Sequence, residues 1–353
     1  ASTTSTPQLL RGFRQGRLYQ AFSGVERDRI DRLMPLALAQ AARYADAERA
    51  IRAFILVIEA IGRRSAYLSL LIENPIALKQ LLHLCAASPW VSRHIGQHPV
   101  ILDELLHPIV DIRERGKSDL SQELEERLAQ VEPGDQEGQL NALREFHQAQ
   151  VLRIAAADVS GVLEVGDVHR SLTELAEVLL QQVFDDSVEH VKSRNGEMPG
   201  HAGIIAYGKF ASAELGYHSD LDVVVCYLPS TAGDTGIGHE QEYFYSRVGR
   251  RLIHLLTVRT QAGILYDLDM RLRPSGRSGT LVTSLGGFFD YQMKDAWTWE
   301  HQALVRARPV VGSEEFVREF ERMRNTILGL KRESVQLQSD ITAMRRKMID
   351  ANC

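Results

Sequence analysis

Two carboxylates that precede an apolar run are the residues of this sequence best suited to chemistry. Asp220 and Asp222 flank Leu221 directly before the run 223–227. Side chains alternate across a strand, so the two carboxylates would share a face and repel each other unless a cation lies between them. Paired carboxylate oxygens are the ligands that Mg²⁺ prefers. The pair therefore predicts a divalent-metal site, although an isolated Asp-x-Asp is more often a solvated turn that leads into a strand.

A second stretch, residues 264–272, alternates apolar and polar side chains and predicts another strand. Its polar face would carry first two acids, Asp267 and Asp269, and then the guanidinium groups of Arg271 and Arg273. A half-exposed antiparallel strand explains the alternation but not this order. A carboxylate followed by arginines suits a metal–triphosphate complex. We expect Asp269 to hold metal and the arginines to contact phosphates, with Asp267 the weaker candidate because it lies farther back.

A glycine turn precedes the first pair of acids. Gly208 follows a predicted strand at 202–207 and precedes a polar turn at 211–214, where backbone amides could meet phosphate oxygens. The spacing matches neither the P-loop nor the Gly-x-Gly-x-x-Gly pattern of dinucleotide-binding domains. Both of those classes are therefore excluded.

Composition excludes further classes of protein. The chain has 353 residues with 41 basic and 46 acidic side chains, a formal net charge of −5, so it lacks the cationic field that holds nucleic acid or anionic lipid. No apolar run approaches the ~18 residues of a membrane span. We expect neither a nucleic-acid nor a membrane partner. Cys85, Cys226 and Cys353 have no metal-ligand spacing and favour a reducing, cytoplasmic location.

The elements that must position these residues are mostly helical. Apolar spacings of three and four predict short helices over about 28–107, and Pro75, Pro89 and Pro99 each open a new one. Turn-forming pairs between 192 and 200 mark a domain boundary. We expect an α+β protein that is predominantly α, and a segment of a longer chain at both ends. The expected divisions are a helical N-terminal region at 1–195, a domain with the strands at 196–312, and the start of a helical domain at 313–353.

The order of these motifs resembles the nucleotidyltransferase fold of the polymerase-β type, and their amino-acid sequences are similar to those of the glutamine synthetase adenylyltransferases. The similar stretch covers about residues 199–310, with further similarity at 59–67 and 85–90. Its motifs are Tyr207-Gly208-Lys209-Phe210, Glu214-Leu215-Gly216-Tyr217, Ser219-Asp220-Leu221-Asp222, Asp269-Met270-Arg271-Leu272-Arg273-Pro274-Ser275-Gly276 and the run from Ala296 to Arg308.

The resemblance implies a polymerase-β-like domain flanked by helical regions. It also implies transfer of AMP from ATP to a tyrosine hydroxyl of glutamine synthetase, with release of pyrophosphate. Control by glutamine and by the signalling protein PII is implied too, but neither effector is assigned to a residue. The residues implied to hold two Mg²⁺ ions are Asp220, Asp222 and Asp269, and those implied to bind the nucleotide are Gly208, Lys209, Ser219, Arg271 and Arg273. The wider superfamily has Gly-Ser where this chain has Gly208-Lys209, so Lys209 or Ser219 would replace that serine.

The family carries two such domains, one that attaches AMP and one that removes it. Two sequence motifs resemble the attaching half: Arg-Pro-Ser-Gly at 273–276 and Trp-Thr-Trp-Glu-His at 297–301. Two alternatives stay open. One is the AMP-removing half, which would consume phosphate and release ADP, and the other is a catalytically silent scaffold that senses nucleotide. Arg306 and Arg308 fit either a phosphate contact or a solvated helix end.

Overall fold

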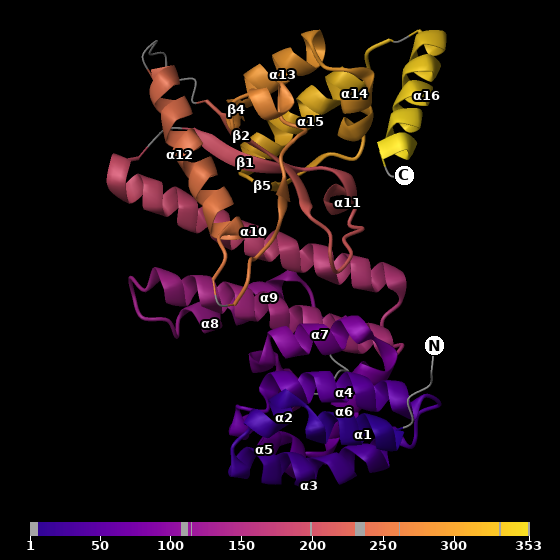
Figure 1. The fold of residues 1–353 in the computed structure, drawn as a ribbon. Helices are drawn as coiled ribbons and strands as arrows, with labels where there is room; N and C mark the ends of the chain where they lie inside the picture. Colours follow the sequence, from indigo (N-terminus) through magenta and orange to yellow (C-terminus); the bar gives the residue numbers. More distant parts are fainter. Residues whose placement is uncertain are drawn as a thin grey trace. The chain divides into compact units, whose positions relative to one another are not determined.

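The protein is described by a computed structural model that covers residues 6–106, 112–113, 115–197, 200–229, 237–260, 262–331 and 333–351. Residue contacts divide the chain into two compact units, Ala1–Val168 and His169–Cys353. The described part of the first unit is helical, whereas the second contains a sheet (Figure 1). No helix within the described ranges combines the length and the apolar character that a bilayer crossing requires.

The first unit packs the apolar faces of successive helices into a core. Ile51, Phe54 and Ile58 of α4, for example, follow the helical period and are fully buried. α6 and α7 begin at Pro75 and Pro89, as expected, because proline's missing N–H has no partner at that position in any helix. The helices are α1 (Thr6–Gln15), α2 (Arg17–Ala21), α3 (Gly24–Ala41), α4 (Ala47–Ile61), α5 (Ser65–Glu73), α6 (Pro75–Ala87), α7 (Pro89–Gln97), the 3₁₀ helix η1 (Pro99–Leu106), α8 (Lys117–Leu128) and α9 (Gln136–Val159).

The second unit is built on a small mixed sheet. β1 (His201–Ala206) pairs antiparallel with both β2 (Leu221–Leu228) and β5 (Arg308–Val311). β2 pairs in parallel with β3 (Leu268–Asp269) at its start and with β4 (Val282–Ser284) farther along. The helices are α10 (Val165–Asn195), which begins just before the unit's boundary, α11 (Gly208–Ala211), α12 (Ile237–Thr257), the 3₁₀ helix η3 (Gly276–Ser278), α13 (Leu285–Lys294), α14 (Thr298–Leu304), α15 (Glu314–Leu328) and α16 (Ser334–Ala351).

One face of this sheet carries the core of the second unit. Ile205 of β1 and Val224 of β2 belong to this core together with Phe288 of α13 and Phe316 of α15. Because side chains alternate along a strand, Asp222 lies on the same face as Val224 but at the start of β2. The core thus fixes which way the carboxylate points.

The expected α+β class, predominantly α, is confirmed, but the strand expected at 264–272 is reduced to Leu268–Asp269, and the residues on both sides of it are not in a strand. Beyond Asp269 the chain turns: the N–H of Arg273 donates to the carbonyl of Met270 at 3.3 Å, and the N–H of Gly276 donates to that of Arg273 at 2.8 Å. Ser275 and Gly276 have φ of 60° and 56°, which no strand allows. The division at 195/196 remains a prediction.

Arg308 connects three segments of the second unit. Its Nε donates to the carbonyl of Ala211 at 2.7 Å and its Nη2 to that of Phe210 at 3.3 Å. Nη2 also forms an ion pair with Glu177 of α10, a residue only 4% exposed. Arg308 is therefore a half-buried residue of β5 that binds other parts of the protein. It lies neither at a solvated helix end nor in a phosphate contact, the two environments expected from the sequence. The guanidinium holds the turn after Gly208 against β5 and α10.

We expect Arg308→Lys to lower the free energy of unfolding by about 2 kcal/mol, because an ammonium group cannot serve two carbonyls and a buried carboxylate together. Urea unfolding of the purified chain measures this. Arg306→Lys is the matched control: Arg306 meets Glu214 at 3.5 Å with both side chains more than half exposed, and such pairs contribute about 0.5 kcal/mol or less. Equal losses in the two variants would contradict the role given to Arg308.

Candidate active site

The parallel pairing of β2 and β3 brings together two acids that are far apart in the sequence. Leu221 pairs with Leu268, and Asp222 pairs with Asp269. The N–H of Leu221 donates to the carbonyl of Asp267 at 2.9 Å, which fixes this register. Paired residues on neighbouring strands project to the same face, so the carboxylates of Asp222 and Asp269 lie side by side.

Gly208 makes room for one of these carboxylates. The N–H of Tyr207 donates to the backbone carbonyl of Asp222 at 2.9 Å, so the glycine turn begins beside the start of β2. A Cβ added to Gly208 would lie 2.4 Å from Oδ2 of Asp222, and the glycine has a φ of +54°. Both facts require glycine at this position.

The environment of Asp222 disfavours its ionised form. Burial is the main cause of a pKa raised from 3.8 to about 6, and the neighbouring acids Asp220 and Asp269 raise it further. The cations of Arg271 and Lys209 act in the opposite direction. A carboxylate held partly out of water beside like charges is a good position for a cation.

Asp269 already has a cationic partner, Arg271. The Nε of Arg271 donates to Oδ1 at 2.9 Å and to Oδ2 at 2.7 Å, its Nη2 pairs with the same carboxylate, and its backbone N–H donates to Oδ1 at 2.9 Å. The guanidinium lowers the pKa of Asp269. Since the Arg271 side chain is 69% exposed, it can leave the carboxylate for an anionic ligand without losing a buried contact.

Arg273 and Ser219 stabilise turns. The Nη1 of Arg273 donates to the carbonyl of Met270 at 2.9 Å, and its Nη2 donates to that of Arg277 at 3.4 Å. The hydroxyl oxygen of Ser219 accepts the N–H of Gly216 at 3.0 Å. The structure therefore gives both residues a local structural role, and their contact with nucleotide stays a prediction.

The expected site residues differ in how closely they gather. Asp222, Asp269, Gly208 and Arg271 form one group, with exposed Lys209 and Asp220 at its edge. Among the residues that the structure describes, no three His, Cys, Asp or Glu side chains are grouped closely enough to hold a metal. The donor set nevertheless fits a hard divalent cation, because it consists of carboxylate oxygens and Gly208 leaves space for one of them.

Sequence reasoning missed the contacts that hold the start of α14. The Tyr291 hydroxyl donates to Oε1 of Glu300 at 2.9 Å, and the backbone N–H of Trp297 donates to Oε2 at 2.9 Å. Burial raises the pKa of Tyr291, and its hydrogen bond to Glu300 raises it further. Tyr291 thus joins α13 to the first turn of α14, and nothing in its sequence spacing indicates this.

Comparison with known proteins adds independent information. Residues 78–323 match the family described as glutamate-ammonia ligase adenylyltransferase. Relatives named bifunctional glutamine synthetase adenylyltransferase/adenylyl-removing enzyme occur in Thioalkalivibrio sulfidiphilus and Pseudomonas putida, each 42% identical over 97% of this chain and 36% of the relative. One from Nitrosococcus oceani is 43% identical with the same coverage. The chain spans about a third of the length of these relatives.

Gly208→Ala should lower the free energy of unfolding by about 2–3 kcal/mol, through backbone strain and collision with Asp222. In the Asp222→Ala background the cost should fall to about 1 kcal/mol, because only the strain remains. Gly286→Ala is the control, since a Cβ there meets nothing within 4 Å. Chemical denaturation of the four variants gives the coupling, and strictly additive losses would show that Gly208 and Asp222 do not interact.

Asp222→Asn should raise the stability of the metal-free chain at pH 8, on the order of 1 kcal/mol after screening of a half-buried group. The folded-state pKa of about 6 lies above the ordinary 3.8, so Asp222 destabilises the fold increasingly as the pH rises from about 4 to 6, and fully above that. The gain from Asp222→Asn should therefore shrink toward pH 4. Melting temperatures from pH 4 to 8, with exposed Asp267→Asn as control, test this; a gain independent of pH would contradict it.

Proposed function

The chain belongs to the glutamate-ammonia ligase adenylyltransferase family, and we propose that it transfers AMP from ATP to a tyrosine hydroxyl of glutamine synthetase. The observation that carries the proposal is the pairing of Asp222 with Asp269 beside Gly208. Acids on adjacent strands next to a glycine turn are suited to an enzyme that handles a metal-bound triphosphate. Because the chain covers about a third of its relatives, its substrate and partner are part of the proposal.

Each residue of the group has a role in this reaction. Asp220, Asp222 and Asp269 would hold two Mg²⁺ ions, which when bound neutralise triphosphate charge and lower the pKa of the attacking hydroxyl. Arg271 would exchange its carboxylate partner for phosphate oxygens, because its fork of donors suits both. Lys209, exposed near Asp222, would add a second positive charge toward the phosphates.

We assign the chain to the AMP-attaching half of the family because of its sequence motifs at 273–276 and 297–301. Pyrophosphate is then the second product. Regulation by glutamine and PII and a cytoplasmic location belong to the same proposal, without assigned residues.

The test is incubation of the chain with glutamine synthetase and ATP labelled in the α-phosphate, with and without glutamine. We expect labelled AMP on a tyrosine, and at least about a 100-fold lower rate for Asp222→Asn although its melting temperature is not lowered. Arg271→Lys should lose about tenfold despite its retained charge, because a point charge cannot replace a two-pronged contact. The control Arg277→Lys, at another exposed arginine, should keep the rate.

The same assay separates the alternatives. Release of ADP from adenylylated glutamine synthetase in the presence of phosphate, without AMP attachment, would assign the chain to the AMP-removing half. Binding of ATP with Mg²⁺ in calorimetry but no transfer under any effector condition would favour the silent scaffold. Either result contradicts the proposed reaction.

A further inference from the structure

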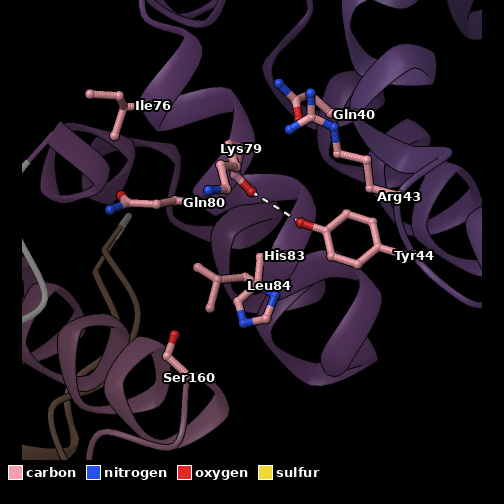
Figure 2. A pocket seen from close by; sticks show the side chains of 9 residues that line it. All are labelled: Gln40, Arg43, Tyr44, Ile76, Lys79, Gln80, His83, Leu84 and Ser160. Atoms are coloured by element: carbon pink, nitrogen blue, oxygen red, sulfur yellow. Dashed lines mark hydrogen bonds between the residues drawn. The ribbon is translucent and has the colours of Figure 1, made fainter.

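A cavity of about 400 Å³ opens in the first unit, apart from the group of acids in the second. Figure 2 shows side chains from the end of α3 and from α6 around it, with Ser160 at its edge. The opposite face of α6 is buried in the core through Leu78, Leu81 and Cys85. The volume falls within the range of small-molecule pockets, so this second face of α6 lines a space of ligand size. The residues of α6 that line it are Ile76, Lys79, Gln80, His83 and Leu84.

The lining has an excess of positive charge. It contains Arg43 and Lys79 but no Asp or Glu. Neither cation forms an ion pair in the described part of the chain, whereas Arg52 on the neighbouring α4 pairs with Glu48 at 2.8 Å. Two cations at one cavity without a carboxylate attract an oxyanion, and a guanidinium can bind one with two hydrogen bonds.

One residue of the lining, Gln80, carries an acceptor without a donor. Oε1 of Gln80 is buried, and no described group donates a hydrogen bond to it. Such an atom is costly unless a ligand or water supplies the donor. The Tyr44 hydroxyl does not supply it, because it donates to the backbone carbonyl of Lys79 at 3.5 Å (Figure 2).

Aromatic and apolar groups complete the lining. The rings of Tyr44 and His83 lie 6.0 Å apart in a tilted arrangement and form one wall. Ile76 is 70% exposed although it lines the cavity, and Leu84, farther along α6, is buried. A ligand that covers Ile76 would remove apolar surface from water.

We propose that this cavity binds a small metabolite that combines a carboxylate or phosphate group with a hydrogen-bond donor. Arg43 and Lys79 neutralise the anion, Oε1 of Gln80 accepts the ligand's donor, and Ile76 contacts its body. The site lies in the helical unit and is separate from the residues proposed for AMP transfer, so its existence does not depend on that reaction.

Isothermal titration calorimetry of the 353-residue chain tests this with three probes: inorganic phosphate, L-malate and succinate. Binding of inorganic phosphate would indicate a phosphate group as the natural anion, whereas binding of the dicarboxylates alone would indicate a carboxylate. Malate should bind more tightly than succinate, because only malate has a hydroxyl that can donate to Gln80. Arg43→Gln/Lys79→Gln should weaken the binding at least about tenfold. The charge-matched control Arg17→Gln/Arg32→Gln, outside the cavity, should bind as the unmodified chain does.

Three results would overturn the proposal. The first is that neither phosphate nor malate binds with a Kd below about 10 mM. The second is that Arg43→Gln/Lys79→Gln binds as tightly as the unmodified chain. The third is an equal loss in the two double variants, which would reduce the effect to net charge. Equal affinity for malate and succinate would contradict the role of Gln80.

Discussion

The repulsion between two carboxylates held side by side on neighbouring strands is the constraint on which the second unit depends. The register of β2 and β3 places Asp222 beside Asp269, and burial keeps water from screening the pair fully. The surrounding groups limit the cost. Gly208 leaves out a Cβ that would collide with one carboxylate, and Arg271 neutralises the other. The cation and the phosphate-bearing ligand that we propose would account for these groups together.

Like charges stay close together only in a rigid environment, and several contacts of the second unit provide that rigidity. The apolar face of the sheet packs against α13 and α15 behind the acids. Arg308 holds the turn after Gly208 to Glu177, and Tyr291 connects α13 to Glu300 of α14. Each of these contacts is half-buried or buried and made by a polar group with specific geometry. They therefore position the site more strictly than apolar packing alone would.

The sequence predicts the local parts of this arrangement well and the non-local parts poorly. The apolar run after Asp222 and the turn at Gly208 indicate β1 and β2 directly, because both signals are local. The pairing of Asp222 with Asp269 requires a register between distant segments, which tertiary packing decides. The alternation at 264–272 is misleading because it continues past Asp269 while the backbone turns. No local sequence pattern predicts the ion pair between Arg308 and Glu177, because the two residues are far apart in the sequence and meet only in the folded chain.

We propose that Asp222 and Asp269 share a cation while Arg271 turns to the phosphates. Crystals of the chain with Mn²⁺ and a non-hydrolysable ATP analogue, measured at the manganese absorption edge, test this most directly. We expect anomalous density in contact with both carboxylates and the guanidinium of Arg271 on the triphosphate. Manganese bound without either acid, or a triphosphate in place with Arg271 still paired to Asp269, would contradict it.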